Sequence, residues 1–168
     1  ESVGSIVHEM RLIKDEHEIK LMRKAADISA DSHIKAMQVC KPGKYEYQLQ
    51  ATMESHFVHE GGTCPAYTSI VGGGDNATVL HYIKNRDELA DGDLVLIDAA
   101  AEFEMYAADI TRTFPVNGIF SETQRAVYQV VLDAQKAVIE ASKPGVTFQE
   151  LHDLDLKLLV EGMIKIGL

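Results

Sequence analysis

Two aspartates, Asp98 and Asp109, stand eleven positions apart in LVLIDAAAEFEMYAADITRTFP, residues 94–115, and each follows mostly apolar residues. A turn centred near Phe103 and Glu104 would fold this stretch into an antiparallel hairpin. In that register the two aspartates lie directly opposite each other on one face, with Cβ atoms about 5 Å apart. Like charges in such positions repel, and the penalty grows where little water reaches them. The pair therefore needs something that neutralises it.

Two arrangements relieve a carboxylate pair of this kind. The two groups can share a proton, as in aspartic proteases, but this chain lacks the two Asp-Thr/Ser-Gly loops of that class. Alternatively, a divalent cation binds both, which requires only hard oxygen ligands and suits Mg²⁺, Mn²⁺, Zn²⁺ or Co²⁺. A simpler reading is that either aspartate merely begins a loop or caps a helix. Two carboxylates do not complete a metal site, so further ligands would be needed.

Histidine is the next residue type that could take part in such a site. His81 ends the apolar run TVLHY among the predicted strands, which makes it the best candidate for a polar group near the aspartates. A buried histidine with satisfied hydrogen bonds is the alternative. The remaining histidines fall in helical or terminal stretches and are predicted to be solvated: His8, His17, His33, His56, His59 and His152.

The elements that would position these residues follow from periodicity and from Gly and Pro breaks. Apolar residues at helical spacing predict one long helix or two over 15–40, ended by KPG, and another over 45–62. Short strands are predicted in TSIVGGG and NATVLHY, in DGDLVLIDAA and in YAADITRTFPVNG. The apolar run 94–97 is typical of a strand buried on both faces. Two helices follow, in 121–145 and 147–168, so the class is α+β.

A weak internal repeat accompanies this order. A shift of 102 positions aligns KPGKYEYQL (41–49) with KPGVTFQEL (143–151), where four of nine residues coincide, and places Asp31 on Asp133. Chance similarity between two amphipathic helix pairs is the alternative. If the repeat is real, its second copy has helices and no strands, so the chain would end halfway through a pseudo-two-fold fold.

Length and charge restrict the functional classes. By length, 168 residues make one domain. Sixteen basic against 26 acidic residues give a net charge of −10, which argues against nucleic acid or an anionic membrane as a partner. No apolar run approaches the roughly 20 residues that span a bilayer. The N-terminal stretch, which starts without Met, has no signal-peptide pattern. Two cysteines are too few for a disulfide framework, which favours a cytoplasmic location.

Three segments together resemble one enzyme family. PAYTSIVGGGDNATVLHY, DGDLVLIDAAAEFEMYAADITRTFPVNGIF and SETQRAVYQVVLDAQ are similar to Xaa-Pro aminopeptidase (aminopeptidase P), one of the pita-bread metallopeptidases with prolidase and methionine aminopeptidase. The likeness covers nearly the whole chain, and DITRTFP favours aminopeptidase P over prolidase. One departure is Ala100, where the family usually has glycine. The resemblance implies the pita-bread fold, a pseudo-two-fold sheet covered by helices.

The resemblance also implies a site. It assigns Asp98 to one metal, Asp109 to a position bridging two metals, His81 to substrate contact near the scissile bond, and Tyr67 to a nearby position. It implies two divalent metal ions, usually Mn²⁺, with Zn²⁺ or Co²⁺ possible. The substrates would be peptides with penultimate proline, and the full-length protein would be a homo-oligomer. The family's other ligands, one His and two Glu, and a further site histidine lie beyond the end of this sequence.

The resulting division assigns residues 1–14 to a linker from an absent N-terminal domain and 15–168 to the first half of a catalytic domain. On its own, this chain would then be inactive and would expose an apolar seam. Three other readings of the protein remain: an Xaa-Pro dipeptidase (prolidase), a metal-free relative of the creatinase type, and a non-catalytic pita-bread module that binds peptides or proteins. Retention of both aspartates and of His81 counts against the last two.

Overall fold

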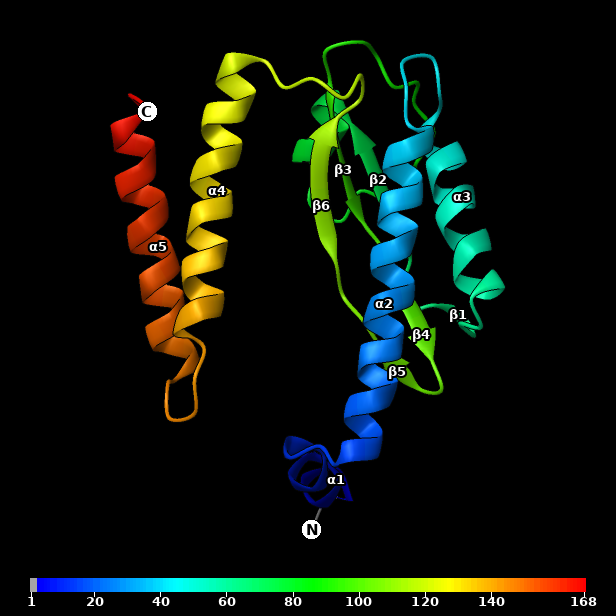
Figure 1. Cartoon of the computed structure of the whole chain (residues 1–168), viewed down its shortest axis with the longest axis vertical. Helices are drawn as coiled ribbons and strands as arrows, with labels where there is room; N and C mark the ends of the chain where they lie inside the picture. Colours follow the sequence, from blue (N-terminus) through cyan, green and yellow to red (C-terminus); the bar gives the residue numbers. More distant parts are fainter. Residues whose placement is uncertain (1–2) are drawn as a thin grey trace. The chain divides into compact units, whose positions relative to one another are not determined.

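The computed structural model describes residues 3–168, which form two compact units, one ending at Ile119 and the other running from Phe120 to Leu168. The first unit carries three helices and all six strands, and the second is a helical hairpin (Figure 1). The α+β class predicted from the sequence is confirmed. No helix among residues 3–168 is both long and apolar enough to cross a membrane.

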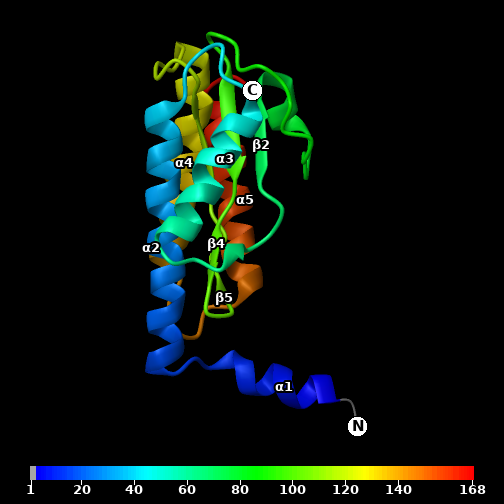
Figure 2. The ribbon, with the colours of Figure 1, turned by 90° about the vertical axis from the view of Figure 1, so that its right-hand side faces the viewer.

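Three helices open the first unit: α1 (Val3–Leu12), α2 (Glu16–Val39) and α3 (Glu46–His59). The stretch 15–40 thus forms one helix, and Asp15 caps it because its carboxylate accepts from the Glu18 N–H while Glu18 returns a bond to the Asp15 N–H. α2 and α3 pack side by side (Figures 1 and 2). None of the described residues of α1 is buried.

Six strands among residues 3–168 form two small antiparallel sheets. One has the order β2–β3–β6, with β2 (Ile70–Gly73), β3 (Leu94–Asp98) and β6 (Thr111–Pro115). The other has the order β1–β4–β5, with β1 (Cys64–Pro65), β4 (Ala101–Phe103) and β5 (Tyr106–Ala107). The chain passes from β3 into β4 and from β5 back into β6, so one long hairpin contributes to both sheets.

Two expectations about these strands are wrong. NATVLHY is not a strand, because residues Gly74–Thr78 form a 3-10 helix, η1, and the chain then turns without sheet pairing. The apolar run of β3 is not buried on both faces either. Val95 and Ile97 are fully buried, whereas Leu94 and Leu96 on the other face are partly exposed. An antiparallel strand with one covered face produces this alternation.

The core lies between helices α2 and α3 and the two sheets. α2 contributes Ile28 and Ala36, and α3 contributes Leu49, Met53 and Phe57. The strands, the loop before β3 and the residues directly after β3 and β6 supply the facing residues, which are Val71, Leu89, Val95, Ile97, Ala99, Ala101 and Val116. This packing fixes the ends of β2 and β3 against the helices, and the candidate site lies at those ends.

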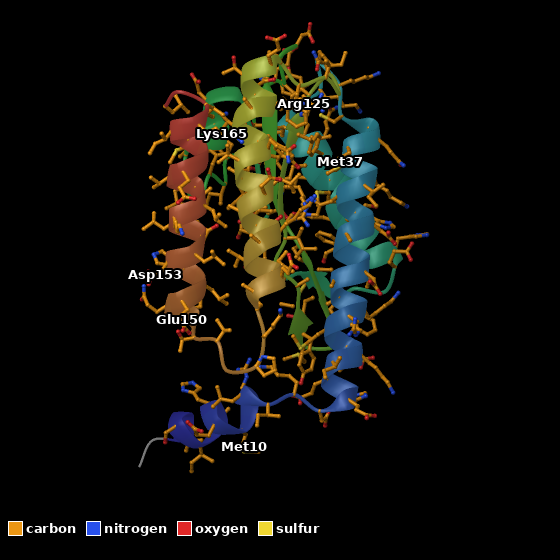
Figure 3. The ribbon with its side chains drawn as sticks, turned by 60° about the vertical axis from the view of Figure 1, so that its left-hand side comes forward. Met10, Met37, Arg125, Glu150, Asp153 and Lys165 are labelled. Atoms are coloured by element: carbon orange, nitrogen blue, oxygen red, sulfur yellow. The ribbon has the colours of Figure 1, made fainter. Side chains whose placement is uncertain are left out.

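The second unit consists of α4 (Glu122–Ala141) and α5 (Phe148–Lys165), which pack against each other. Ser121 and Thr147 cap the two helices through bonds to Gln124 and Glu150. Glu150 lies in the first turn of α5 and Lys165 in the last, where acidic and basic side chains complement the helix dipole (Figure 3).

The local structure supports the internal repeat. The shift of 102 places Gly43 on Gly145, and both glycines have positive φ, 83° and 97°. The turn bond from Lys44 N to Lys41 O recurs from Val146 N to Lys143 O. The same shift aligns the N-caps Tyr45 and Thr147, whose backbone N–H groups are each bound by the side chain three residues later. Both copies therefore share their turn and cap geometry as well as four residues.

Candidate metal centre

Asp98 and Asp109 occupy different kinds of backbone. Asp98 is the last residue of β3 and is half-buried, because the neighbouring residues of that strand pack into the core. Asp109 lies in the irregular segment between β5 and β6 and is exposed. Hydrogen bonds from Ala99 N to Ile110 O and from Ala108 N to Ala101 O hold the two segments together across this irregular stretch.

The prediction that the two aspartates face each other directly is wrong. Asp98 pairs with Thr111, and the β4–β5 pairs keep the same register, in which Phe103 lies opposite Tyr106. The turn consists of Glu104 and Met105, one residue later than predicted, and both have positive φ, 46° and 72°. Two consecutive left-handed residues are typical of the two-residue turn that suits the twist of a hairpin. EFEMY contains no glycine or asparagine that would have indicated this position.

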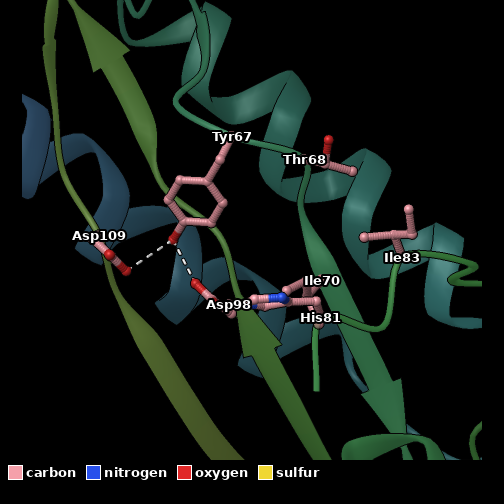
Figure 4. Close-up of a pocket in the computed structure, with 7 residues that line it drawn as sticks. All are labelled: Tyr67, Thr68, Ile70, His81, Ile83, Asp98 and Asp109. Carbon is pink, nitrogen blue, oxygen red and sulfur yellow. Dashed lines mark hydrogen bonds between the residues drawn. The ribbon is translucent and has the colours of Figure 1, made fainter. Parts of the chain in front are cut away.

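The two carboxylates nevertheless converge. The Tyr67 hydroxyl donates to Asp98 Oδ1 at 2.6 Å and lies 3.3 Å from Asp109 Oδ1 (Figure 4). Burial raises the pKa of Tyr67, and the hydrogen bond to Asp98 raises it further. The phenol therefore stays protonated and serves as a donor between two acids. The central expectation, that Asp98 and Asp109 approach a common position, agrees with this geometry.

An open pocket of about 360 Å³ surrounds the acids. Besides Tyr67, Asp98 and Asp109, its lining consists of Thr68, Ile70, His81 and Ile83 (Figure 4). The structure thus brings together all four predicted site residues. The backbone that carries His81 differs from the prediction. His81 lies in a turn and not at the end of a strand, its side chain is exposed, and its φ is 55°.

Two convergent carboxylates at the rim of an open pocket fit a hard divalent cation. The donor set is incomplete in this chain, since residues 3–168 contain no group of three or more His, Cys, Asp or Glu side chains that could hold a metal. Asp98 and Asp109 can therefore supply two ligands, and completion of the site needs donors from elsewhere. The expectation that the family's other ligands lie outside this sequence stays a prediction.

Two of the histidines predicted to be solvated are in fact buried, His33 on α2 and His56 on α3. His33 lies behind the site, where its Nε2–H donates to the carbonyl of Ala99, the residue after Asp98, at 3.0 Å. Burial lowers the pKa of His33, so the neutral ring is favoured. His33 was missed because helical periodicity alone does not reveal which polar residues face a sheet.

Comparison with known proteins adds to this geometry. The family model described as "Metallopeptidase family M24" matches residues 20–166. This chain belongs to metallopeptidase family M24. The M24 chain is 44% identical to the Xaa-Pro aminopeptidase of Escherichia coli and 48% identical to that of Haemophilus influenzae, and each alignment covers 97% of the M24 chain. It spans only 37% and 38% of those two relatives.

Solved structures give the same family of neighbours. The M24 chain superimposes on Pseudomonas aeruginosa aminopeptidase PepP with a TM-score of 0.97 and 45% identity, covering 99% of this chain and 38% of that one. A zinc-substituted Escherichia coli aminopeptidase P in complex with product gives a TM-score of 0.94 and 44% identity, covering 96% of this chain and 37% of that one. The pita-bread fold expected from the sequence is thereby confirmed over the part that this chain represents.

Proposed function

We propose that this chain contributes Asp98 and Asp109 to a dinuclear metal site of an Xaa-Pro aminopeptidase, which releases the N-terminal residue from peptides with proline in second position. The observation that carries the proposal is the convergence of both carboxylates on the Tyr67 hydroxyl, in a pocket that His81 also lines. The Xaa-Pro aminopeptidases of Escherichia coli and Haemophilus influenzae support the choice of reaction.

Asp98 would bind one cation and Asp109 would bridge two. When bound, such cations lower the pKa of a water molecule into the working range and polarise the scissile carbonyl. Mn²⁺ is the proposed ion, with Zn²⁺ and Co²⁺ as alternatives, and a zinc-substituted relative supports tolerance of more than one metal. Tyr67 would orient the Asp98 carboxylate through its hydrogen bond.

The chain's other pocket residues would act on the peptide. His81 is exposed to the pocket and can donate a hydrogen bond to the substrate or to the oxygen that gains charge during amide cleavage. Proline offers no amide N–H and has a fixed φ, so its recognition depends on shape and apolar contact. Ile70 and Ile83 provide apolar surface in the same pocket.

The test compares two proteins: this chain alone, and a longer protein in which this chain is joined to the segments that its relatives have and it lacks. Bound Mn²⁺ and cleavage of an Xaa-Pro-Xaa tripeptide are measured for each, together with an Xaa-Pro dipeptide. The longer protein should bind metal and cleave the tripeptide, while residues 1–168 should bind metal weakly and hydrolyse little. Full activity from residues 1–168 alone would refute the shared site, preference for the dipeptide would indicate a prolidase, and binding of peptides without cleavage would indicate a non-catalytic module.

Location and assembly form a separate part of the proposal. Cys40 and Cys64 are both free, which suits a reducing compartment such as the cytoplasm. A homo-oligomer is proposed for the longer protein, with peptides and not nucleic acid or membrane as its partners. Analytical ultracentrifugation checks the assembly, and a purely monomeric species at working concentration would contradict it.

A further inference from the structure

Glu46 is a fully buried carboxylate in the first turn of α3. The backbone N–H of Gly73 and the amide of Asn76 donate to its Oε1 at 2.9 and 3.0 Å. The Tyr82 hydroxyl and the backbone N–H of Asp87 donate to its Oε2 at 2.8 and 3.0 Å. All four donors come from the single segment 73–87. One buried acid thus binds both arms of the loop that carries His81.

The same face of α3 continues this pattern. Gln50 and Glu54 follow Glu46 at intervals of four residues, which places all three side chains on one face of the helix. Gln50 Oε1 accepts from Asn85 Nδ2 at 2.9 Å, and Glu54 Oε1 accepts from the Ser69 hydroxyl at 2.9 Å. Thus α3 binds the segment 73–87 at two levels, through Glu46 and Gln50, and binds the residue before β2 at a third level, through Glu54.

Burial of the Glu46 charge is costly unless hydrogen bonds satisfy it. No salt bridge to Glu46 exists in the described part of the chain, so neutral donors alone stabilise the carboxylate. Apolar residues of similar size often replace buried charges with little loss of stability. The specific effect of Glu46 is instead geometric, because four bonds from one acid restrict where the loop between Gly73 and Asp87 can run.

His81 lies inside the restricted segment. It precedes Tyr82, whose side chain is buried, and it has a φ of 55°, which is uncommon for a non-glycine residue. Asn76 on the other arm contacts both Glu46 and the Tyr82 hydroxyl. With both arms anchored, the imidazole is presented to the pocket that contains Asp98 and Asp109.

We propose that Glu46 is a positioning residue for His81, acting through Tyr82 and Asn76. The inference rests on the proposed function, since it gives His81 a role at the substrate. Glu46 does not line the pocket and touches no reacting atom. Its contribution is to hold the loop, and therefore the imidazole, in one place before the peptide binds.

The first measurement is independent of the reaction. Hydrogen–deuterium exchange followed by mass spectrometry compares the full-length protein with its Glu46→Gln variant, which keeps the side-chain shape but replaces one acceptor oxygen with a donor. Exchange in peptides covering 74–87 should rise at least tenfold while β3 keeps its protection. Met53→Ala, which removes buried apolar volume from the same helix, is the matched control and should raise exchange in the α3 core. Unchanged exchange in 74–87 on Glu46→Gln would overturn the proposal.

The second measurement is a double-mutant cycle on kcat/KM for an Xaa-Pro tripeptide. Glu46→Gln should lower kcat/KM by up to about 100-fold, the order of loss that misplacement of a reacting group produces. In a His81→Asn background, which keeps the left-handed backbone at position 81, the same change should have little further effect, whereas Met53→Ala should act equally in both backgrounds. Equal losses from Glu46→Gln with and without His81 would show a merely structural role.

Tyr82→Phe is the second variant, for use if Glu46→Gln does not fold. It removes one donor and leaves three, so the same pattern should follow with a smaller amplitude. A protein that shows the exchange pattern but cleaves no Xaa-Pro peptide would refute the proposed function and leave the positioning of the loop intact. An active enzyme with an unaltered loop in both variants would refute the positioning alone.

Discussion

Asp98 lies opposite Thr111 in the β3–β6 ladder, so Asp109 is displaced by two residues from the position directly across. An even displacement keeps both carboxylates on the same face of the hairpin, because strand side chains alternate with a period of two. The irregular segment between β5 and β6 then lets Asp109 turn toward the Tyr67 hydroxyl. The pair is thus diagonal, and the Tyr67 hydroxyl lies within reach of both carboxylates.

The first prediction concerns the two acids themselves. Asp98→Asn and Asp109→Asn in the longer protein should each weaken Mn²⁺ binding by more than the roughly 10–100-fold that outer-shell changes cost, and should abolish peptide cleavage. Folding should change little, because Asp109 is exposed and Asp98 is half-buried. Calorimetric titration with Mn²⁺ measures the loss, and Asp153→Asn, an exposed acid on α5, is the charge-matched control. Normal rates in either variant would refute the ligand assignment.

The second prediction concerns the hairpin turn. Glu104 and Met105 both adopt positive φ, and Met105 is largely exposed. Replacing them by Asn and Gly (Glu104→Asn with Met105→Gly) should raise the free energy of unfolding by about 0.5–1 kcal/mol, since these residues suit left-handed backbone. Urea denaturation measures the change. Metal affinity should stay the same because the register is unchanged; a shift in affinity would show that the turn controls the acids.

The third prediction concerns acid sensitivity at His33. Burial lowers the pKa of His33, and the hydrogen bond to Ala99 opposes this only in part. The unfolded chain therefore takes up a proton near pH 6.5 that the folded chain resists, so this group's stabilising contribution is present above that pH and is lost as the pH falls. Urea denaturation at pH 7.5 and 5.5 should show a larger loss for the native protein than for His33→Gln. Equal losses would contradict the assignment.

The fourth prediction concerns alkaline sensitivity at Tyr82. Burial raises the pKa of Tyr82 to about 12, and the hydrogen bond to Glu46 adds to the effect. The folded state then keeps a proton that the unfolded state releases near pH 10. The contribution of Tyr82 is complete below pH 10 and disappears as the pH rises toward 12. Denaturation at pH 9 and 11 should therefore show a smaller pH-dependent loss in Tyr82→Phe; an identical loss would argue against this role.

The extent to which the fold follows from sequence depends on the element. The KPG segments at 41–43 and 143–145 correctly predict the ends of α2 and α4, because proline interrupts a helix and glycine favours the left-handed turn after its last residue. The prediction of a strand at NATVLHY is wrong because Asn76 binds Glu46, a partner thirty residues away in the sequence. No local pattern predicts such a contact. The turn of the hairpin is predicted one residue too early for a different reason. Neither Glu104 nor Met105 has a preference for positive φ, so the local sequence does not indicate the turn.

The site shows a similar division. The acids, His81 and Tyr67 were predicted as site residues, and the structure brings them to one pocket. The polar residues behind the pocket, Glu46 and His33, were not recognised, because charged and polar side chains in a helix are usually solvated. The contact of Glu46 with the segment 73–87 and that of His33 with Ala99 depend on tertiary packing, which the sequence of a helix does not reveal. The one available signal was the interval of four in Glu46, Gln50 and Glu54, which recurs on a face that also borders buried Leu49 and Met53.

The left-handed backbone at His81 decides how a mutational scan of this position should be interpreted. Asparagine and glycine accept that conformation, whereas valine and isoleucine strain it. An inactive His81→Asn variant would therefore report on the lost imidazole, while an inactive His81→Val variant would confound lost chemistry with a distorted main chain. Among single replacements, asparagine is the informative one.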